Sequence, residues 1–158
     1  MKLLMFTKHL QPLPVERMAR TVIDLGFDGV DLTVRPNGSI LPERVVEDLP
    51  ELVSVLSDHG LEIGMFTTGF TDASEPHFED TLRMASEHGV ERIKLGYYRY
   101  ESFGNLAARM EEIRARWREM VPLAERYGVT ICVHTHAGDT IPASGEMLYM
   151  MLKGFDPE

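Results

Sequence analysis

Two histidines stand two positions apart near the end of an apolar stretch of the sequence. In "VTICVHTHAGD", His134 and His136 share one face if the stretch continues as a strand. Such a pair could hydrogen-bond a substrate, transfer a proton or supply part of a divalent metal's coordination shell. Neutral histidines satisfied by neighbouring polar groups are the alternative. Asp139 could orient one ring, although an aspartate after a glycine is more often a turn residue.

Lys94 and Arg35 could bring positive charge to the same site. Lys94 lies in the apolar stretch "RIKLGYY", where a buried ammonium needs a carboxylate partner or a bound anion. Asp31, in "GVDLTV", is a candidate partner, so an ion pair and a substrate role both stay open. Arg35 follows in "TVRPNG" and could grip a carboxylate or a phosphate with two N–H groups. A solvated loop arginine is the equal alternative.

Three further polar side chains lie where apolar stretches end, namely His9, Thr68 and Tyr98. Each could instead serve the fold alone. We predict that His134 and Lys94 are catalytic and that the substrate-binding residues are His9, Arg35, Thr68, Tyr98 and His136. We expect all seven side chains to converge on one pocket.

A repeating pattern predicts the elements that hold these residues. Five times an amphipathic stretch meets a glycine and the chain then turns apolar, at Gly26, Gly60, Gly89, Gly128 and Gly154. Glycine just past a helix can adopt the left-handed conformation that ends it. The best helical period is in "NLAARMEEIRARWREM", where the apolar residues form one stripe. The pattern therefore alternates helices with strands.

The predicted strands cover residues 2–7, 29–34, 62–67, 92–97 and 130–134. The predicted helices cover residues 14–25, 42–59, 76–88, 105–127 and 143–153. Repeated βα units predict an α/β fold with a parallel sheet covered by helices. No linker or composition break divides the chain, so residues 1–158 are predicted to form a single domain.

Alternate residues of the inner strands differ in character, and this difference selects the architecture. In the second predicted strand Val30, Leu32 and Val34 share one face, while Asp31, Thr33 and Arg35 share the other. Strands of an open doubly wound sheet would be apolar on both faces. An apolar face toward the helices and a polar face toward a common axis predict a (β/α) TIM-type barrel, with its site at the carboxyl ends of the strands.

Composition limits the functional classes. The chain has 158 residues, 44% of them hydrophobic, a single cysteine and a net charge of −9. The acidic balance disfavours nucleic acid, because a phosphate-backbone binder needs a basic face. No apolar run approaches the ~20 residues that cross a bilayer, so no membrane contact is expected. The single cysteine, Cys132, fits a reducing compartment and predicts a cytoplasmic location.

The sequence resembles the xylose-isomerase-like TIM barrels, also described as sugar phosphate isomerases/epimerases. The resemblance rests on "KHLQPLP", "LGFDGVDLTVRPNG", "GLEIGMFTTGFTD" and "RIKLGYYRY" and extends along the whole chain. It implies chemistry on a small polyol or keto sugar, with proton transfer through an ene-diol. It also implies a divalent metal (Mn, Zn, Co or Mg) that polarises the substrate oxygens.

The stretch that contains the two histidines departs from this family pattern. Members with the metal centre typically carry a glutamate at the end of the fifth strand, and alignment on "VTICVH" places His134 there. Histidine could ligate a metal through nitrogen but lacks the anionic, proton-abstracting character of glutamate. The other usual ligands come from strands six to eight. We therefore expect no metal tightly bound by this chain alone.

Three functions compete at this point. The first is an isomerase or epimerase of a small sugar or related hydroxy-carbonyl compound. The second is a non-catalytic sugar-binding or partner-binding barrel that has lost the metal centre, as His134 would suggest. The third, an apurinic endonuclease, is disfavoured by the acidic charge and by the stretch "FTTGF", which lacks a histidine ligand.

The number of βα repeats predicts an incomplete barrel. Five βα units fall short of an eight-stranded barrel, which takes about 250 residues. A sixth strand would begin at about residue 159 if the repeat pattern continued. We expect either a piece of a longer protein or an assembly in which a second copy covers the open side. On the first view, the isolated chain shows no isomerase turnover.

Overall fold

Five parallel strands form one sheet in the computed structural model, which describes residues 1–155. The sheet has the order β1-β2-β3-β4-β6, with β1 Leu4–Phe6, β2 Gly29–Val34, β3 Glu62–Thr68, β4 Arg92–Lys94 and β6 Thr130–Cys132. The helices are α1 Val15–Asp24, α2 Val45–Asp58, α3 Phe78–Glu87, α4 Leu106–Arg126 and α5 Gly145–Leu152. Two short 3-10 helices, η1 Thr7–His9 and η2 Pro42–Arg44, complete the βα units. The predicted α/β class and parallel sheet are confirmed.

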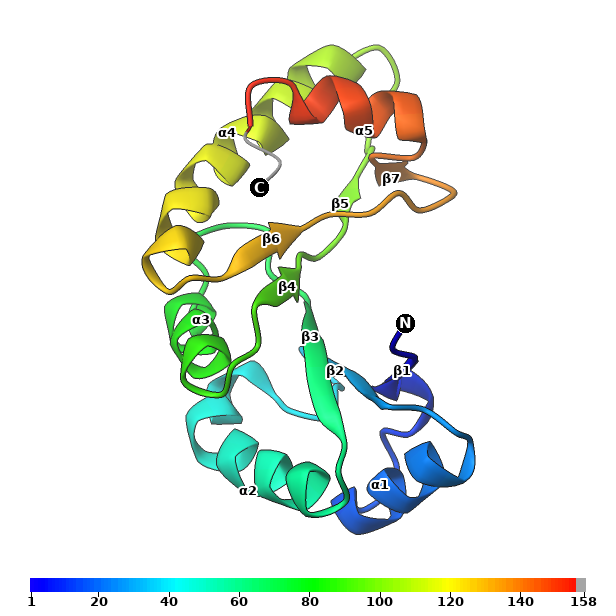
Figure 1. Ribbon diagram of the computed structural model, residues 1–158. Coiled ribbons are helices and arrows are strands. Elements are labelled where there is room, and N and C mark those ends of the chain that lie inside the picture. The colour runs from blue at the N-terminus through cyan, green and yellow to red at the C-terminus, as the bar shows by residue number, and fades with distance from the viewer. Residues whose placement is uncertain (156–158) are drawn as a thin grey trace.

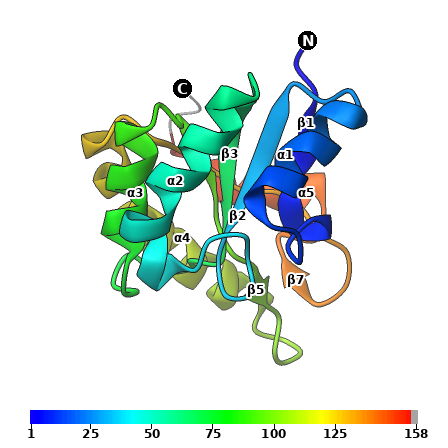
Figure 2. The same cartoon turned by 90° about the horizontal axis from the view of Figure 1, so that it is seen from below.

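The sheet curves into a crescent, and the helices lie along its outer side. Figure 1 shows α1, α2, α3 and α4 following one another around the convex edge, with the strands on the inside. The quarter-turned view of Figure 2 shows α1 and α2 lying over β2 and β3. The concave side of the sheet, which would face the axis of a closed barrel, is left open in this arrangement.

The glycines that follow the helices have the predicted conformation. Gly26, Gly60, Gly89, Gly128 and Gly154 have φ values of +78°, +71°, +70°, +66° and +85°. Each of these values lies in the left-handed region that glycine adopts without a steric penalty. The periodic pattern of the sequence therefore located the helix ends.

The hydrophobic core lies between the convex face of the sheet and the helices. Val30, Leu32 and Val34 of β2 are fully buried there, as the alternating pattern predicted. The helices contribute apolar side chains from one face each, including Val22 of α1 and Trp117 of α4. Burial of this face leaves the polar alternate residues pointing into the concave side.

The predicted strand 92–97 is wrong in its second half. β4 ends at Lys94, and residues Tyr98–Arg99 form a separate strand, β5, which pairs antiparallel with β7, Thr140–Ile141. The chain turns at Gly96, whose N–H donates to the carbonyl of Phe70 at 2.7 Å. The pairing partner lies about forty residues further on, so no local pattern could have indicated it.

Two other strands also end earlier in the chain than predicted. β1 ends at Phe6 and the chain coils into η1, so His9 belongs to a 3-10 turn. β6 ends at Cys132, which places His134 and His136 in the loop that leads to β7. No helix in residues 1–155 combines the length and the hydropathy that crossing a bilayer requires.

We predict that Gly96→Ala destabilises the fold by about 1–3 kcal/mol, the usual range for overpacking. A Cβ atom at Gly96 would lie 2.2 Å from the carbonyl oxygen of Gly69, which is backbone and cannot move away cheaply. Gly145→Ala is the matched control, because a Cβ atom there meets nothing within 4 Å. The control should be neutral or stabilising by up to about 1 kcal/mol. Equal midpoints for the two variants in denaturant unfolding would contradict this account.

Candidate functional site

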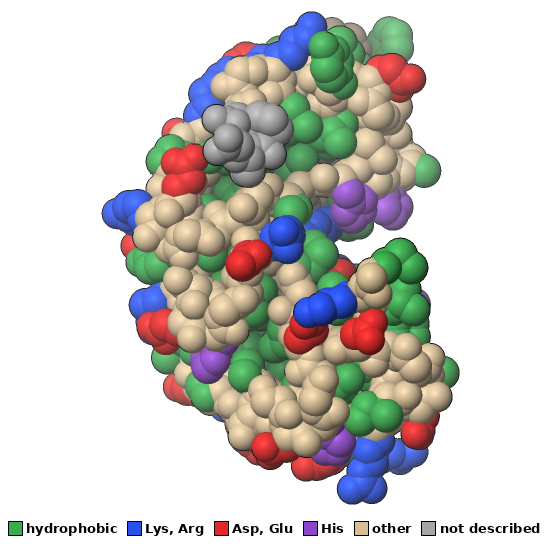
Figure 3. Space-filling view, viewed as in Figure 1, with side chains coloured by type: hydrophobic (Ala, Val, Ile, Leu, Met, Phe, Trp, Pro, Cys, Tyr) green, Lys and Arg blue, Asp and Glu red, His purple; other side chains and the backbone are tan. Residues whose placement is uncertain are grey.

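Ionisable side chains on or just beyond three strands of the sheet, β2, β4 and β6, gather on the concave side, at the carboxyl ends of the strands. They are Asp31 on β2, Arg35 just after it, Lys94 on β4, Tyr97 beyond it and His134 beyond β6. Figure 3 shows this side as a hollow, with histidine side chains gathered at one of its edges. Active sites of barrel enzymes lie at this end of the strands. The five residues are called the concave cluster below.

Lys94 is the most unusual member of the concave cluster. Lys94 is only 5% exposed, and its ammonium lies over the ring of Tyr97, 3.8 Å from the ring centroid. Burial and the nearby Arg35 guanidinium lower the pKa of Lys94 to about 8, although Asp31 acts in the opposite direction. Lys94 can therefore exchange a proton close to neutral pH.

Asp31 shares the inner face with Lys94 but does not form the ion pair that the sequence left open. Its Oδ1 accepts a hydrogen bond from the Thr67 hydroxyl at 2.7 Å. Burial raises the pKa of Asp31, and the Thr67 hydrogen bond and the charges of Lys94 and Arg35 oppose that rise. The Asp31 carboxylate thus acts on Lys94 through its charge, without a direct contact, and its Oδ2 is available to accept another hydrogen bond.

A tight loop after β2 holds Arg35 at the rim of the hollow. The Arg35 N–H donates to the carbonyl of Ile40 at 3.1 Å, and the Arg35 carbonyl accepts from Gly38 N–H at 2.8 Å. The hydroxyl of Thr33 accepts the N–H of Ser39 at 2.8 Å and closes the loop. The guanidinium lies over the ring of Phe6, 5.7 Å from its centroid. Its orientation is therefore supported from β1 as well as from β2.

His134 is coupled to Lys94 through Tyr97. The Tyr97 hydroxyl and Nε2 of His134 lie 2.9 Å apart, and the two rings meet edge to face with centroids 5.2 Å apart. Burial, the charge of Lys94 and the neighbouring His136 lower the pKa of His134. Burial raises the pKa of Tyr97, so its hydroxyl keeps the proton that it can donate to a neutral imidazole.

Tyr97 is the residue of this cluster that sequence alternation missed, and Tyr98 was chosen in its place. Tyr98 is buried on the helix side, where its hydroxyl donates to the carbonyl of Thr71 at 2.8 Å and accepts from Trp117 Nε1 at 3.1 Å. Burial raises the pKa of Tyr98 to about 12. The turn at Gly96 shifts the alternation by one residue, which the sequence alone could not indicate.

Thr68 also lies outside the hollow. It follows Thr67 directly on β3, so it points to the opposite face of the sheet, and its hydroxyl donates to the backbone carbonyl of Lys94 at 2.8 Å. The side chain is buried and its donor is used by the fold. Thr68 therefore supports the backbone that carries Lys94. Thr67, not Thr68, points inward, and its hydroxyl donates to Asp31.

The two remaining predicted residues lie at the rim and are exposed. His9 meets Phe6 with ring centroids 6.2 Å apart, next to the ring that supports Arg35. His136 lies 5.0 Å from the ring of Tyr97, centroid to centroid, and its Nδ1 lies 2.9 Å from the carbonyl of Ala137. Asp139 pairs with Arg99 and is not directed at either histidine.

The donor set does not match a metal centre within residues 1–155. No three side chains of His, Cys, Asp or Glu in this part of the chain are grouped so that they could hold one ion. The rings of His134 and His136 are 6.4 Å apart, centroid to centroid, and have no third donor beside them. A catalytic divalent metal usually has three protein ligands. The predicted metal role of His134 therefore stays a prediction.

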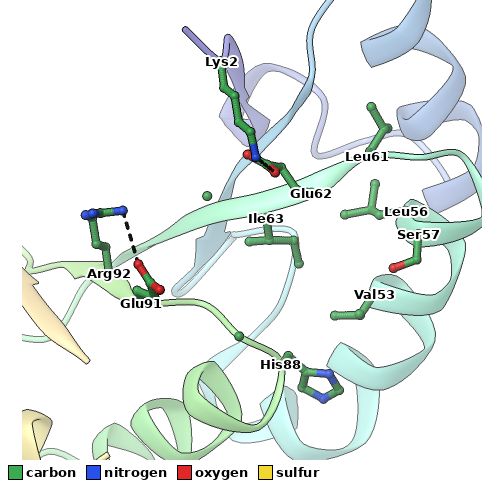
Figure 4. A pocket seen from close by; sticks show the side chains of 12 residues that line it. Lys2, Val53, Leu56, Ser57, Leu61, Glu62, Ile63, His88, Glu91 and Arg92 are labelled. Atoms are coloured by element: carbon green, nitrogen blue, oxygen red, sulfur yellow. Dashed lines mark hydrogen bonds and ion pairs between the residues drawn. The ribbon is translucent and has the colours of Figure 1, made fainter. Parts of the chain in front are cut away.

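A second cavity, of about 510 Å³, lies at the opposite end of the strands. Figure 4 shows its charged side chains in pairs, Lys2 with Glu62 and Arg92 with Glu91. Charges that are already paired offer little to a ligand. The amino-terminal end of a barrel sheet usually serves stability, and the pairing in this cavity agrees with that role.

Solved structures share this fold at low sequence identity. A xylose isomerase-like TIM barrel protein from Mycobacterium smegmatis, in complex with magnesium, matches 96% of this chain and 60% of its own, with 16% identity and a TM-score of 0.71. The probable 3-DHS dehydratase AsbF from Bacillus anthracis matches 96% of this chain and 58% of its own, with 17% identity and a TM-score of 0.73. A D-tagatose 3-epimerase-like protein matches 99% of this chain and 61% of its own, with 18% identity and a TM-score of 0.71.

The chain thus spans about 60% of the length of these solved relatives. No curated protein sequence matches it. The family model described as xylose isomerase-like TIM barrel matches residues 19–157, which is most of the chain. Together with the parallel strands and the outer helices, this match shows that the chain belongs to the xylose isomerase-like TIM barrel family.

Proposed function

We propose that this protein is an isomerase or epimerase of a small sugar or a related hydroxy-carbonyl compound. The observation that carries the proposal is Lys94, a buried amine with a pKa of about 8 at the carboxyl ends of the strands. The family, and neighbours that include a D-tagatose 3-epimerase-like protein, support a sugar-modifying enzyme. The single cysteine supports a cytoplasmic location.

The chemistry of such a reaction needs a group that both takes and gives a proton. Near pH 8 Lys94 is present as amine and as ammonium in similar amounts. The amine can accept the proton from the carbon next to a carbonyl group, and the ammonium can return a proton to the ene-diol that results. The Tyr97 ring below the nitrogen holds it in one place for both steps.

The other members of the concave cluster would orient the substrate. The neutral ring of His134, held by the Tyr97 hydroxyl, can accept or donate a hydrogen bond to a sugar hydroxyl. The free oxygen of Asp31 can accept from another hydroxyl, because Thr67 occupies only Oδ1. Such paired polar contacts fix a polyol against a rigid sheet. These roles use side chains of this chain alone.

A non-catalytic sugar-binding barrel is the second candidate. It is favoured by the donor set, since no three metal-ligating side chains meet in residues 1–155, and by His134 at the position of the family glutamate. Such a protein would keep the contacts for hydroxyl groups and would lack a complete proton-transfer site. The two candidates differ in one observable, which is exchange of the substrate's carbon-bound proton with solvent.

Solvent-exchange measurements in D2O separate the candidates. The protein purified from its source is incubated with D-fructose and D-tagatose, and NMR follows deuterium incorporation at the carbons next to the carbonyl group. We expect incorporation, and we expect Lys94→Met to reduce its rate by about 10²–10⁴-fold, the usual contribution of a general acid–base group. Lys8→Met, which changes an exposed lysine of η1, should leave the rate unchanged.

Binding without incorporation by the source protein would overturn the isomerase proposal and favour the sugar-binding alternative. The 158-residue chain, assayed beside it, is expected to bind the sugar without turnover. Turnover by that chain alone would show that the concave cluster needs no other catalytic groups.

The coupling between Lys94 and His134 gives a separate prediction. Lys94→Met removes a cation that lowers the pKa of His134, so the imidazole should titrate at higher pH in the variant. NMR titration of the His134 ring protons measures this change, with Lys8→Met as the charge-matched control. An unchanged His134 titration in Lys94→Met would show that the two groups are not electrostatically coupled.

A further inference from the structure

Two cations of the concave cluster have no ion-pair partner. Arg35 and Lys94 lie within 4.0 Å of no carboxylate oxygen in residues 1–155, whereas nine other arginines each form such a pair. The other unpaired arginines of the described chain, Arg17 and Arg20, are exposed on α1. Arg35 is half-buried and Lys94 is buried. An unpaired cation costs more in such surroundings than on an open surface.

The two cations also act on each other. Lys94 pairs in register with Thr67 of β3, and Thr67 pairs with Thr33 of β2, so Arg35, two residues beyond Thr33, lies at the same end of the inner face as Lys94. The lowering of the Lys94 pKa by the charge of Arg35 agrees with this placement. The Lys94 nitrogen donates no hydrogen bond to the described protein atoms, yet it is not sealed from the surface. It therefore opens into the hollow. Two cations held close together repel each other, and an anion bound between them offsets that repulsion.

We infer that Arg35 and Lys94 bind a carboxylate group of the substrate, which makes the substrate a small sugar acid. The inference rests on the proposed function only in taking the bound anion to be part of the sugar. The planar guanidinium matches the two oxygens of a carboxylate and makes the direct contact. The protonated form of Lys94 attracts the same group through its charge, which leaves the Lys94 nitrogen free to face the reacting carbon of the proposed function.

Charge balance selects a carboxylate over a phosphate. With Lys94 protonated, the cluster of Asp31, Arg35 and Lys94 carries a charge of +1, because one carboxylate faces two cations. A carboxylate of charge −1 neutralises this cluster. A phosphate monoester of charge near −2 would leave an excess negative charge beside Asp31. The tyrosine and the histidine of the cluster are neutral near pH 7 and do not change this balance.

Three ketoses that differ at one carbon test this inference. In D-fructuronate, D-fructose and D-fructose 6-phosphate this carbon belongs to a carboxylate, a hydroxymethyl group and a phosphorylated hydroxymethyl group. Calorimetric titration of the 158-residue chain at pH 7 should show D-fructuronate binding at least tenfold more tightly than D-fructose. It should also bind more tightly than the 6-phosphate. Equal affinity for the acid and the neutral sugar, or a preference for the phosphate, would overturn the inference.

Variants assign the preference to the two cations. Arg35→Gln and Lys94→Met should each remove most of the tenfold preference for D-fructuronate. Arg20→Gln, which removes an exposed positive charge from α1, should retain it. Circular dichroism confirms folding of each variant, and Arg35→Lys serves as a second variant that keeps the charge but loses the fork. A preference that survives both Arg35→Gln and Lys94→Met would place the carboxylate elsewhere and overturn the inference.

The pH dependence supplies an independent readout. Lys94 loses its proton as the pH rises through about 8, so the preference for D-fructuronate should fall between pH 7 and pH 9.5. Asp31, Arg35, Tyr97 and His134 are the charged or titratable groups that face Lys94. The preference should not fall in Lys94→Met over this range, and a fall of the same size there would contradict the assignment.

The experiments distinguish failure of the carboxylate inference from failure of the isomerase proposal. If the source protein exchanges deuterium into neutral ketoses and prefers no acid, the isomerase proposal stands and the carboxylate inference fails. If the chain prefers D-fructuronate in an Arg35-dependent manner and no exchange occurs, the inference stands and the isomerase proposal fails.

Discussion

The site depends on one constraint, which is an ammonium buried at the inner face of the sheet without a carboxylate in contact. An isolated charge at such a position is strongly unfavourable unless other interactions offset the lost hydration. The Tyr97 ring beneath Lys94 contributes about 0.5–2 kcal/mol by cation–π attraction, and the field of Asp31 adds to it. The remaining cost shows as the lowered pKa. The same cost gives Lys94 its chemistry, because an amine with an ordinary pKa would hold its proton at neutral pH.

Contacts around the end of β4 position this nitrogen. The Thr68 hydroxyl holds the Lys94 carbonyl, and the next residues turn away where Gly96 meets Phe70. The close approach of Gly96 to Gly69 leaves no room for a side chain at that point. The turn then brings Tyr97 under Lys94 and against His134. The small β5–β7 pair beyond it anchors the loop that carries the histidines.

Features of the fold that repeat along the chain could be predicted from sequence, and features that depend on one long-range contact could not. The helix-ending glycines and the apolar face of β2 follow local rules of backbone strain and alternation, and the structure confirms both. The inward position of Lys94 follows from the alternation along β4, whereas Arg35 and His134 lie just beyond the ends of β2 and β6. Tyr97 was missed because a hydrogen bond from Gly96 to Phe70 interrupts it, and no sequence pattern records that bond.

Charged side chains at the two ends of the sheet differ in whether they are paired, and this difference supports the proposed site at the carboxyl ends. At the amino ends the charges are paired, Lys2 with Glu62 and Arg92 with Glu91, so the fold uses them itself. At the carboxyl ends Arg35 and Lys94 are held apart from carboxylates. The chain as a whole has a net charge of −9, which repels anions at a distance. Since salt screens such repulsion beyond about 8 Å, the proposed carboxylate site depends on the local pair of cations and not on the net charge.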